Sequence, residues 1–205
     1  MSKYDLKTGD ILLFDGNSKN WFFKTFDFVI KYFTNSKYTH IGLVLKDPTY
    51  INPDLKGYYV WESGSETTPD PQDNKKKFGV QITPLEHIVD SYLNNGGYVY
   101  YRKINSNKNF NIEKLLDIHK VVYDKPYDFD IIDWIDAGLK KDGKKVQKTD
   151  KFWCSAFVGY IYDKCNIIKE STNWTILTPN DFSETGENLD FINNFYLEQE
   201  EDYIK

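Results

Sequence analysis

The sequence of 205 residues lacks the features that define several classes of protein. Its formal net charge of -5 is the opposite of the basic excess that phosphate binding requires, so we expect no nucleic-acid partner. No apolar run approaches the roughly 18 residues needed to span a bilayer. The first residues, Met1 to Asp5, also lack the apolar region of a signal peptide. We therefore expect a cytoplasmic protein without a transmembrane segment, while peripheral contact with a membrane stays open.

Cysteine and arginine are scarce. Only Cys154 and Cys165 occur, and a disulfide between them would need oxidising conditions that the missing signal peptide argues against. Their spacing matches no common zinc pattern, and we expect neither a metal nor an organic cofactor. Arg102 is the only arginine, a bias that resembles translation of an A/T-rich genome such as that of some large DNA viruses or protists. A viral product would act in the host cell or the virion.

Apolar residues are plentiful enough for a substantial core. With 40% hydrophobic and 17% aromatic residues, the chain is not expected to be disordered. Its length fits one domain over residues 1–205, with a core at about 9–181 and an acidic C-terminal extension over 182–205 that covers an edge. No internal repeat or linker divides the chain, and its oligomeric state stays open.

The pattern of apolar residues indicates both strands and helices. Apolar runs bounded by turn residues predict strands over 10–14, 39–45, 58–62, 79–82 and 97–103. Helical spacing predicts amphipathic helices over 21–33, over 112–122 and from 153 onward. Thr83-Pro84-Leu85-Glu86 fits a capping box that opens a further helix to about Leu93. The polar segments 67–77 and 138–151 are expected to be loops, the first of them mobile.

Cys154 is the candidate nucleophile. Most free cysteines act as small apolar core residues, but this one is predicted in the first turn of a helix. Free backbone N–H groups and the helix dipole favour a thiolate there, and the small neighbour Ser155 would let a carbonyl approach. Cys165 falls near the end of the same helix, where the dipole opposes a thiolate, so we assign it a packing role.

Of the three histidines, His40 is the best candidate for a base. His87 lies off its helical stripe and is expected to be solvated, whereas His119 lies on an apolar face that is typical of a hydrogen-bonded core histidine. If the loop after the His40 strand is symmetric about Ile51, His40 falls directly opposite Glu62, at a Cβ separation of about 4.5–5.5 Å. A one-residue slip would separate the two, and a glutamate is otherwise most often simple surface charge.

Together these residues form the parts of a nucleophile, base and orienter system. Cys154 would attack, His40 would move protons, and Glu62 would hold the imidazole in one tautomer. Tyr127, in Lys125-Pro126-Tyr127-Asp128, is a candidate contact for the sulfur or the oxyanion, although packing is its alternative role in a chain with 16 tyrosines.

Five short motifs in order carry a family resemblance. They are Gly9-Asp10-Ile11-Leu12-Leu13, Tyr38-Thr39-His40-Ile41-Gly42, Trp61-Glu62, Tyr127-Asp128 and Phe152-Trp153-Cys154-Ser155-Ala156-Phe157-Val158. This order resembles the circularly permuted NlpC/P60 family of papain-like thiol hydrolases, in the branch that groups YiiX-like enzymes with a poxvirus protein. The resemblance spans about residues 9–181. It implies an α+β fold with a mainly antiparallel sheet, and it implies Cys154, His40 and Glu62 as the catalytic residues.

The expected function is a cysteine-dependent hydrolase of the amidase or peptidase type that works through a thioester acyl-enzyme. The resemblance implies substrates such as cell-wall-type peptides with D-residues or γ-linked glutamate, while related permuted members act on lipid esters and amides. A lipid acyl hydrolase or acyltransferase of the same fold is therefore one alternative. A non-catalytic binding or virion-associated module is the other, and the presence of Cys154, His40 and Glu62 together weighs against it.

Overall fold

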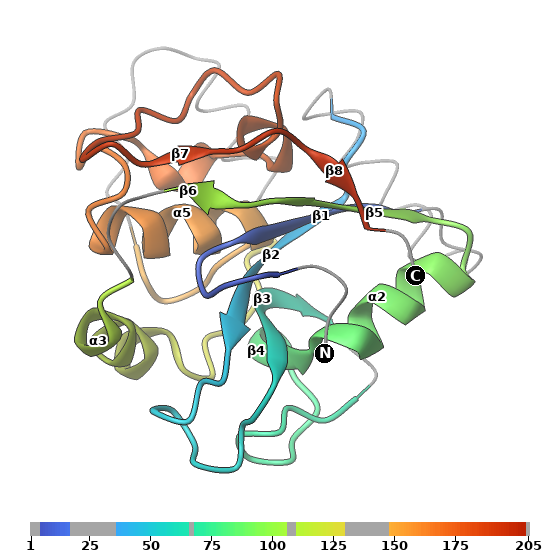
Figure 1. Cartoon of the computed structure of the whole chain (residues 1–205). Helices are drawn as coiled ribbons and strands as arrows, with labels where there is room; N and C mark the ends of the chain where they lie inside the picture. The colour runs from blue at the N-terminus through green and yellow to red at the C-terminus, as the bar shows by residue number, and fades with distance from the viewer. Residues whose placement is uncertain (1–4, 17–35, 66–67, 106–109, 130–147, 204–205) are drawn as a thin grey trace.

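A six-stranded antiparallel sheet forms the centre of the protein (Figure 1). The computed structural model describes residues 5–16, 36–65, 68–105, 110–129 and 148–203. The strand order is β4-β3-β2-β1-β5-β8, and a separate two-stranded sheet pairs β6 with β7. The strands are β1 (Ile11–Asp15), β2 (His40–Lys46), β3 (Tyr58–Ser65), β4 (Phe78–Pro84), β5 (Tyr98–Arg102), β6 (Ile104–Asn105), β7 (Tyr196–Leu197) and β8 (Glu201–Asp202).

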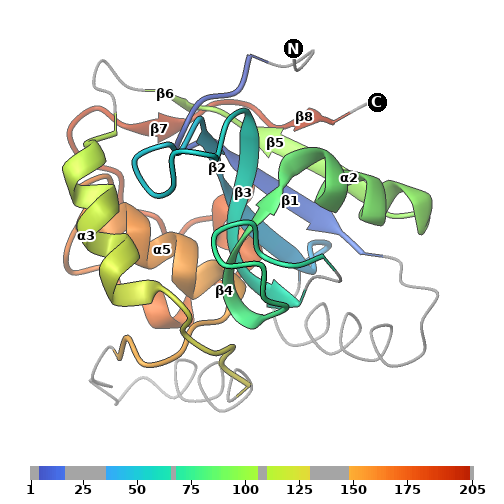
Figure 2. The same cartoon turned by 90° about the horizontal axis from the view of Figure 1, so that it is seen from below.

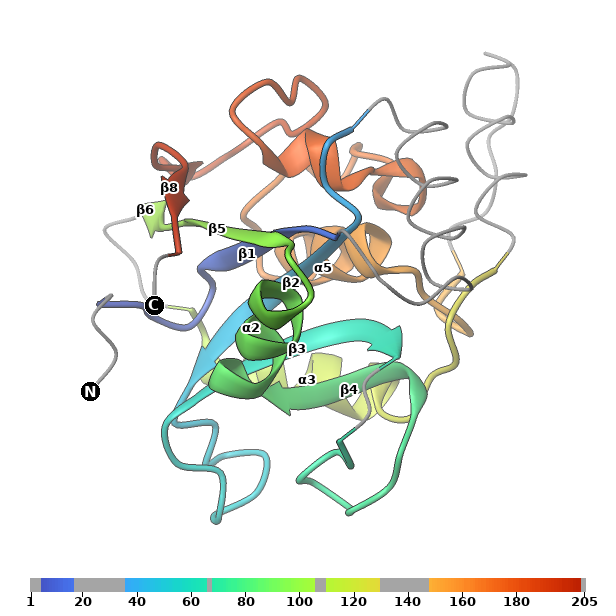
Figure 3. The ribbon, with the colours of Figure 1, turned by 90° about the vertical axis from the view of Figure 1, so that its right-hand side faces the viewer.

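Helices cover both faces of this sheet. Successive side chains of a strand point to opposite faces, and the buried residues divide accordingly into two apolar clusters. One cluster includes α3 (Ile112–Val122) and α5 (Cys154–Lys164), and the other includes α2 (Leu85–Asn94). Figure 3 shows α2 on the opposite side of the sheet from α5, and Figure 2 shows α3 and α5 on one side. Two short 3-10 helices, η1 (Trp174–Ile176) and η2 (Pro179–Phe182), follow α5.

The predicted elements of the described residues are confirmed, with small changes at their ends. Apolar runs became buried strands, and the amphipathic 112–122 stretch is α3, whose N-cap Asn111 accepts hydrogen bonds from two backbone N–H groups. The α+β class with an antiparallel sheet is likewise observed. The helix predicted over 21–33 and most of the loop predicted over 138–151 lie outside the described residues. No described helix has both the length and the apolar character that crossing a bilayer requires.

The segment predicted to be a mobile loop over 67–77 is irregular but anchored where it is described. Asp70 is buried and accepts hydrogen bonds from the backbone N–H of Ile82 and from the side chain of Gln72. The Lys77 ammonium lies 2.9 Å from Asp70 and 3.0 Å from Asp73, and its side chain is only 6% exposed. Because a buried charge is costly without partners, this cluster holds the segment against β4.

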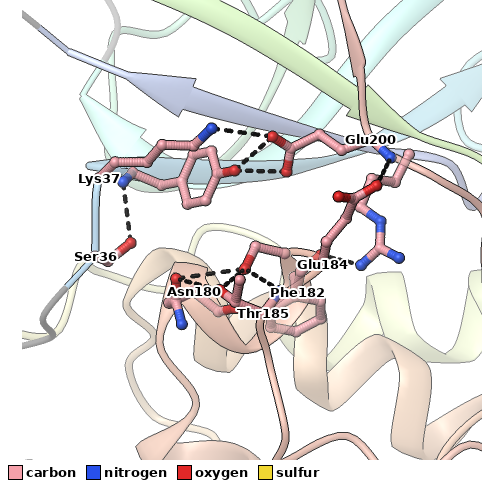
Figure 4. Close-up of polar contacts among 10 residues, drawn as sticks. Ser36, Lys37, Asn180, Phe182, Glu184, Thr185 and Glu200 are labelled. Atoms are coloured by element: carbon pink, nitrogen blue, oxygen red, sulfur yellow. Dashed lines mark hydrogen bonds and ion pairs between the residues drawn. The ribbon is translucent and has the colours of Figure 1, made fainter.

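The acidic C-terminal extension covers a sheet edge, as predicted. β8 pairs with β5, and Glu200, just before β8, accepts hydrogen bonds from the Tyr38 hydroxyl at 2.5 and 2.6 Å. Figure 4 shows the same carboxylate facing the ammonium group of Lys37, which lies 3.1 Å away. Arg102 donates to three backbone carbonyls of the extension. They are those of Phe182, Leu197 and Glu198, at 2.9, 3.0 and 2.7 Å.

We predict that Arg102→Lys loosens this extension. An ammonium group cannot satisfy three carbonyls spread around a planar guanidinium, so stability should fall by about 1–3 kcal/mol. Hydrogen exchange followed by mass spectrometry should show faster exchange in 183–203 and unchanged exchange in β2. Lys169→Met, which removes an exposed ion pair with Asp190, is the control and should cost less than about 1 kcal/mol. Equal exchange in the wild type and Arg102→Lys would contradict the prediction.

Candidate active site

The structure brings His40 and Glu62 into direct contact. His40 begins β2 and Glu62 lies in the middle of β3, and His40 Nε2 lies 2.5 Å from Glu62 Oε2. Glu62 is fully buried and His40 is 8% exposed. A carboxylate at this position fixes the orientation of the imidazole and occupies Nε2, which leaves Nδ1 to face another group.

The register of this pair differs from the prediction by two residues. Leu43 pairs with Trp61, and the same register continued along β2 places His40 level with Gly64 rather than Glu62. Two residues is one full strand period, so His40 and Glu62 stay on the same face and meet diagonally. Gly64 makes this possible, because a Cβ there would lie 3.2 Å from both Glu62 Oε2 and His40 Cε1.

Cys154 is the first residue of α5, as predicted. The N-cap residue Trp153 makes no side-chain capping bond, and the first turn holds no acidic residue, so the positive end of the helix dipole is not neutralised there. The start of α5 is anchored to β3, since the Ser63 hydroxyl donates to the Phe152 carbonyl at 2.7 Å. The Cys154 side chain is buried, with 0% exposure.

Cys154 also lies close to His40, because it is one of the groups that shift the pKa of the imidazole. Burial by itself would lower the pKa of His40, but its interactions with Cys154 and Glu62 outweigh burial and raise the pKa to about 10. The imidazole is therefore protonated at neutral pH. His40 thus contacts Glu62 directly and lies close to Cys154, and the three residues come from two strands and a helix.

Tyr127 lies beside this group, on a short segment between β4 and α5. Its backbone N–H donates to Phe78, and the segment forms isolated bridges with Gly79 and Phe152. Burial, followed by the nearby charges of Cys154 and Asp128, raises the pKa of Tyr127 well above its usual value. The phenol therefore stays protonated.

Thr83 is a contact that sequence reasoning missed. The predicted capping box is wrong: α2 begins at Leu85 after Pro84, and no side chain caps it. The Thr83 hydroxyl instead donates to Glu62 Oε1 at 2.5 Å. The Thr83-Pro84-Leu85-Glu86 motif predicts a local cap. It does not reveal that the partner of the hydroxyl lies 21 residues away on a neighbouring strand.

The other candidate groups lie outside this arrangement. His119 Nε2 lies 2.5 Å from Gln72 Oε1, which fits the hydrogen-bonded core histidine that was predicted. His87 is half-buried rather than solvated as predicted, and its Nε2 is buried without a hydrogen-bond partner among the described residues. Burial raises the pKa of the Cys165 thiol to about 12. Among the described residues, no three histidine, cysteine, aspartate or glutamate side chains gather as a metal site would require.

A comparison with solved structures gives a distant likeness. No family model and no curated protein matches the chain. A solved structure, that of the metalloprotein YiiX (DUF1105) from Escherichia coli O157:H7, is similar over 81% of this chain and 71% of its own. The TM-score is 0.47 and the sequences are 19% identical. The resemblance to permuted NlpC/P60 hydrolases therefore continues to rest on the motifs.

The raised pKa of His40 predicts a specific pH dependence of stability. A group whose pKa rises on folding contributes stability fully below its unfolded value, about 6.5, and loses that contribution as the pH approaches about 10. The difference in unfolding free energy between wild type and His40→Gln should therefore shrink from pH 6 to pH 10, by at most about 1.4 kcal/mol per pH unit.

Urea unfolding over this range of pH would measure the difference. Glu62→Gln serves as a second variant, and it should flatten the same pH dependence because it removes the anion that His40 faces. A free-energy difference between wild type and His40→Gln that stays constant from pH 6 to pH 10 would refute the prediction.

Proposed function

We propose that the chain is a cysteine-dependent acyl hydrolase of the amidase or peptidase type, with a permuted papain-like relationship to the NlpC/P60 enzymes. The observation that carries the proposal is the position of His40, which is hydrogen-bonded to Glu62 and lies close enough to Cys154 for that residue to shift its pKa. Acyl transfer needs a nucleophile, a base and a group that orients the base, and Cys154, His40 and Glu62 would supply them in that order.

In the first half of the reaction, the Cys154 thiolate attacks the carbonyl carbon of an amide or ester. The carbonyl π electrons move to oxygen, and free N–H groups at the start of α5 stabilise the oxyanion. The protonated Tyr127 phenol is a further candidate donor. As the tetrahedral intermediate collapses, protonated His40 donates its proton to the leaving amine or alkoxide, and a thioester to Cys154 remains.

In the second half, neutral His40 takes a proton from water as the water oxygen attacks the thioester carbon. Collapse releases the carboxylic acid and returns the electron pair to sulfur, which restores the thiolate and the imidazolium. Glu62 stabilises the imidazolium in both halves without taking its proton. Water could be replaced by another acceptor, which would make the same site an acyltransferase.

Access to the sulfur is an added requirement of this proposal. Reactive cysteines are usually partly exposed, whereas Cys154 is buried. Neighbouring side chains therefore have to move before a substrate carbonyl reaches the sulfur, and small reagents are the appropriate first probes.

We predict that iodoacetamide labels Cys154 at a pH well below about 8.5, the value of a free thiol. Mass spectrometry resolves the two cysteines, and Cys165, whose pKa is raised to about 12, is the internal control that should stay unlabelled. His40→Ala should slow labelling of Cys154 by at least about tenfold, because the imidazolium no longer holds the thiolate. If Cys154 is inert, or reacts like a free thiol regardless of His40, the enzyme proposal fails and a non-catalytic binding module takes its place.

A lipid acyl hydrolase or acyltransferase is the second candidate, because exposed aromatic residues lie beside the site. Phe78 and Phe129 are 42% and 63% exposed, and their rings stack with centroids 5.0 Å apart. Both rings also contact Tyr127, at 5.1 and 5.4 Å. An apolar surface next to the proposed nucleophile suits an acyl chain, and it would also serve peripheral contact with a membrane.

The second candidate predicts a preference for long acyl chains. The rate of Cys154 acylation by p-nitrophenyl octanoate, relative to the acetate, should fall about tenfold in Phe129→Ser, which loses apolar contact area. The acetate rate itself should not change. Tyr98→Ser, at an equally exposed aromatic on β5, is the matched control and should leave the ratio unaltered. A ratio near one in the wild type would favour the peptide and amide class instead.

A further inference from the structure

Thr83 is the second-last residue of β4, the strand that pairs with the Glu62 strand. Its hydroxyl points to the candidate site rather than to the helix that follows. It is 2% exposed, and its Oγ1 donates to Glu62 Oε1 at 2.5 Å. We infer that Thr83 is a positioning residue that holds the Glu62 carboxylate against His40, an inference that rests on the proposed function.

The helix after Thr83 goes without a side-chain cap. In the sequence Thr83-Pro84-Leu85-Glu86, a threonine hydroxyl would ordinarily accept a hydrogen bond from the first turn of the helix. α2 receives no such bond, although an acidic residue, Glu86, lies in its first turn. A hydroxyl directed at a buried carboxylate instead of an available helix end points to a role in the site.

Thr83 and His40 bind the two oxygens of the same carboxylate. His40 Nε2 lies 2.5 Å from Oε2, and Thr83 Oγ1 lies 2.5 Å from Oε1. One contact fixes the position of a carboxylate. Two contacts, one from the strand on each side of β3, fix its plane as well. The flexible glutamate side chain then has a single orientation, and that orientation sets the direction of the imidazole.

Two other residues near Glu62, Gln81 and Gly64, do not hold its carboxylate. Gln81 is the residue directly opposite Glu62 on β4 and is buried, yet its Nε2 makes no hydrogen bond among the described residues. Gly64 contributes no side chain. The titratable groups that face His40 are Glu62, Cys154 on α5 and Tyr92 on α2, whose ring stacks with the imidazole at a centroid distance of 6.5 Å.

The first experiment compares the pH profile of Cys154 alkylation in wild type, Thr83→Val and Thr83→Ser. A buried carboxylate that loses a donor is less stable as an anion, so the imidazolium that it supports is lost as well. In Thr83→Val we expect the rate at pH 7 to fall about tenfold. The low-pH limb of the profile should move up by about one pH unit. Thr83→Ser keeps the hydroxyl and should restore both to within about twofold.

Thr178→Val is the matched control, because Thr178 also donates its hydroxyl to a carboxylate, that of Asp181, outside the site. It should leave the alkylation profile unchanged even if it lowers stability in urea as much as Thr83→Val does. A wild-type profile in Thr83→Val, or a profile that Thr83→Ser does not rescue, would overturn the inference.

The second experiment does not depend on the reactivity of the thiol. NMR titration of His40 in a Cys154→Ser background, with and without Thr83→Val, measures the imidazole directly. We expect the pKa of His40 to fall by about one unit when the threonine hydroxyl is removed. An unchanged or higher pKa would refute the positioning role. If alkylation shows an inert Cys154 while this shift is present, the proposed enzyme activity fails and the Thr83–Glu62–His40 arrangement stands.

Discussion

A carboxylate buried away from water needs a hydrogen-bond donor for each of its oxygens, and the arrangement of three strands depends on meeting that need at Glu62. The strand that carries Glu62 lies between β2 and β4, and each neighbour supplies one partner, His40 or Thr83. A one-residue slip of either neighbour would turn its partner to the other face and leave a buried charge unpaired. A single side chain therefore constrains the register on both sides of β3.

The same strand also ties the cysteine helix to the sheet. Trp61 points to the opposite face from Glu62, and its ring packs edge-on against Phe157 of α5 at a centroid distance of 5.3 Å. Ser63, two residues further on, donates to the carbonyl of Phe152 just before the helix. Three consecutive residues of β3 thus pack α5, hold the imidazole and anchor the start of the helix. The relative position of thiol and imidazole is a property of this strand, not of either residue alone.

The strands and the first turn of α5 could be predicted because their signals are local. The register of His40 could not, because the sequence does not reveal the centre of the loop. The Asp47 N–H donates to the Gly57 carbonyl and the Gly57 N–H donates to the Asp47 carboxylate. Both residues have positive φ, and this closure places the centre of the loop one residue beyond Ile51. Each residue of shift in the centre moves the pairing by two. The prediction that His40 and Glu62 share one face of the sheet is therefore correct, whereas the prediction that they lie directly opposite each other is wrong. The contact of His40 with Cys154 spans more than a hundred residues, and only the order of the motifs anticipated it.

Thr83 shows why a local rule can fail at a functional site. A threonine before proline and glutamate has a hydroxyl that two partners can use, the end of the next helix or a group on a neighbouring strand. A helix end near water can be satisfied by water, whereas a buried carboxylate has no such substitute. The hydroxyl therefore goes to Glu62, where the free energy lost without it is larger. As a consequence, α2 has no side-chain cap, although this helix has no part in the proposed mechanism.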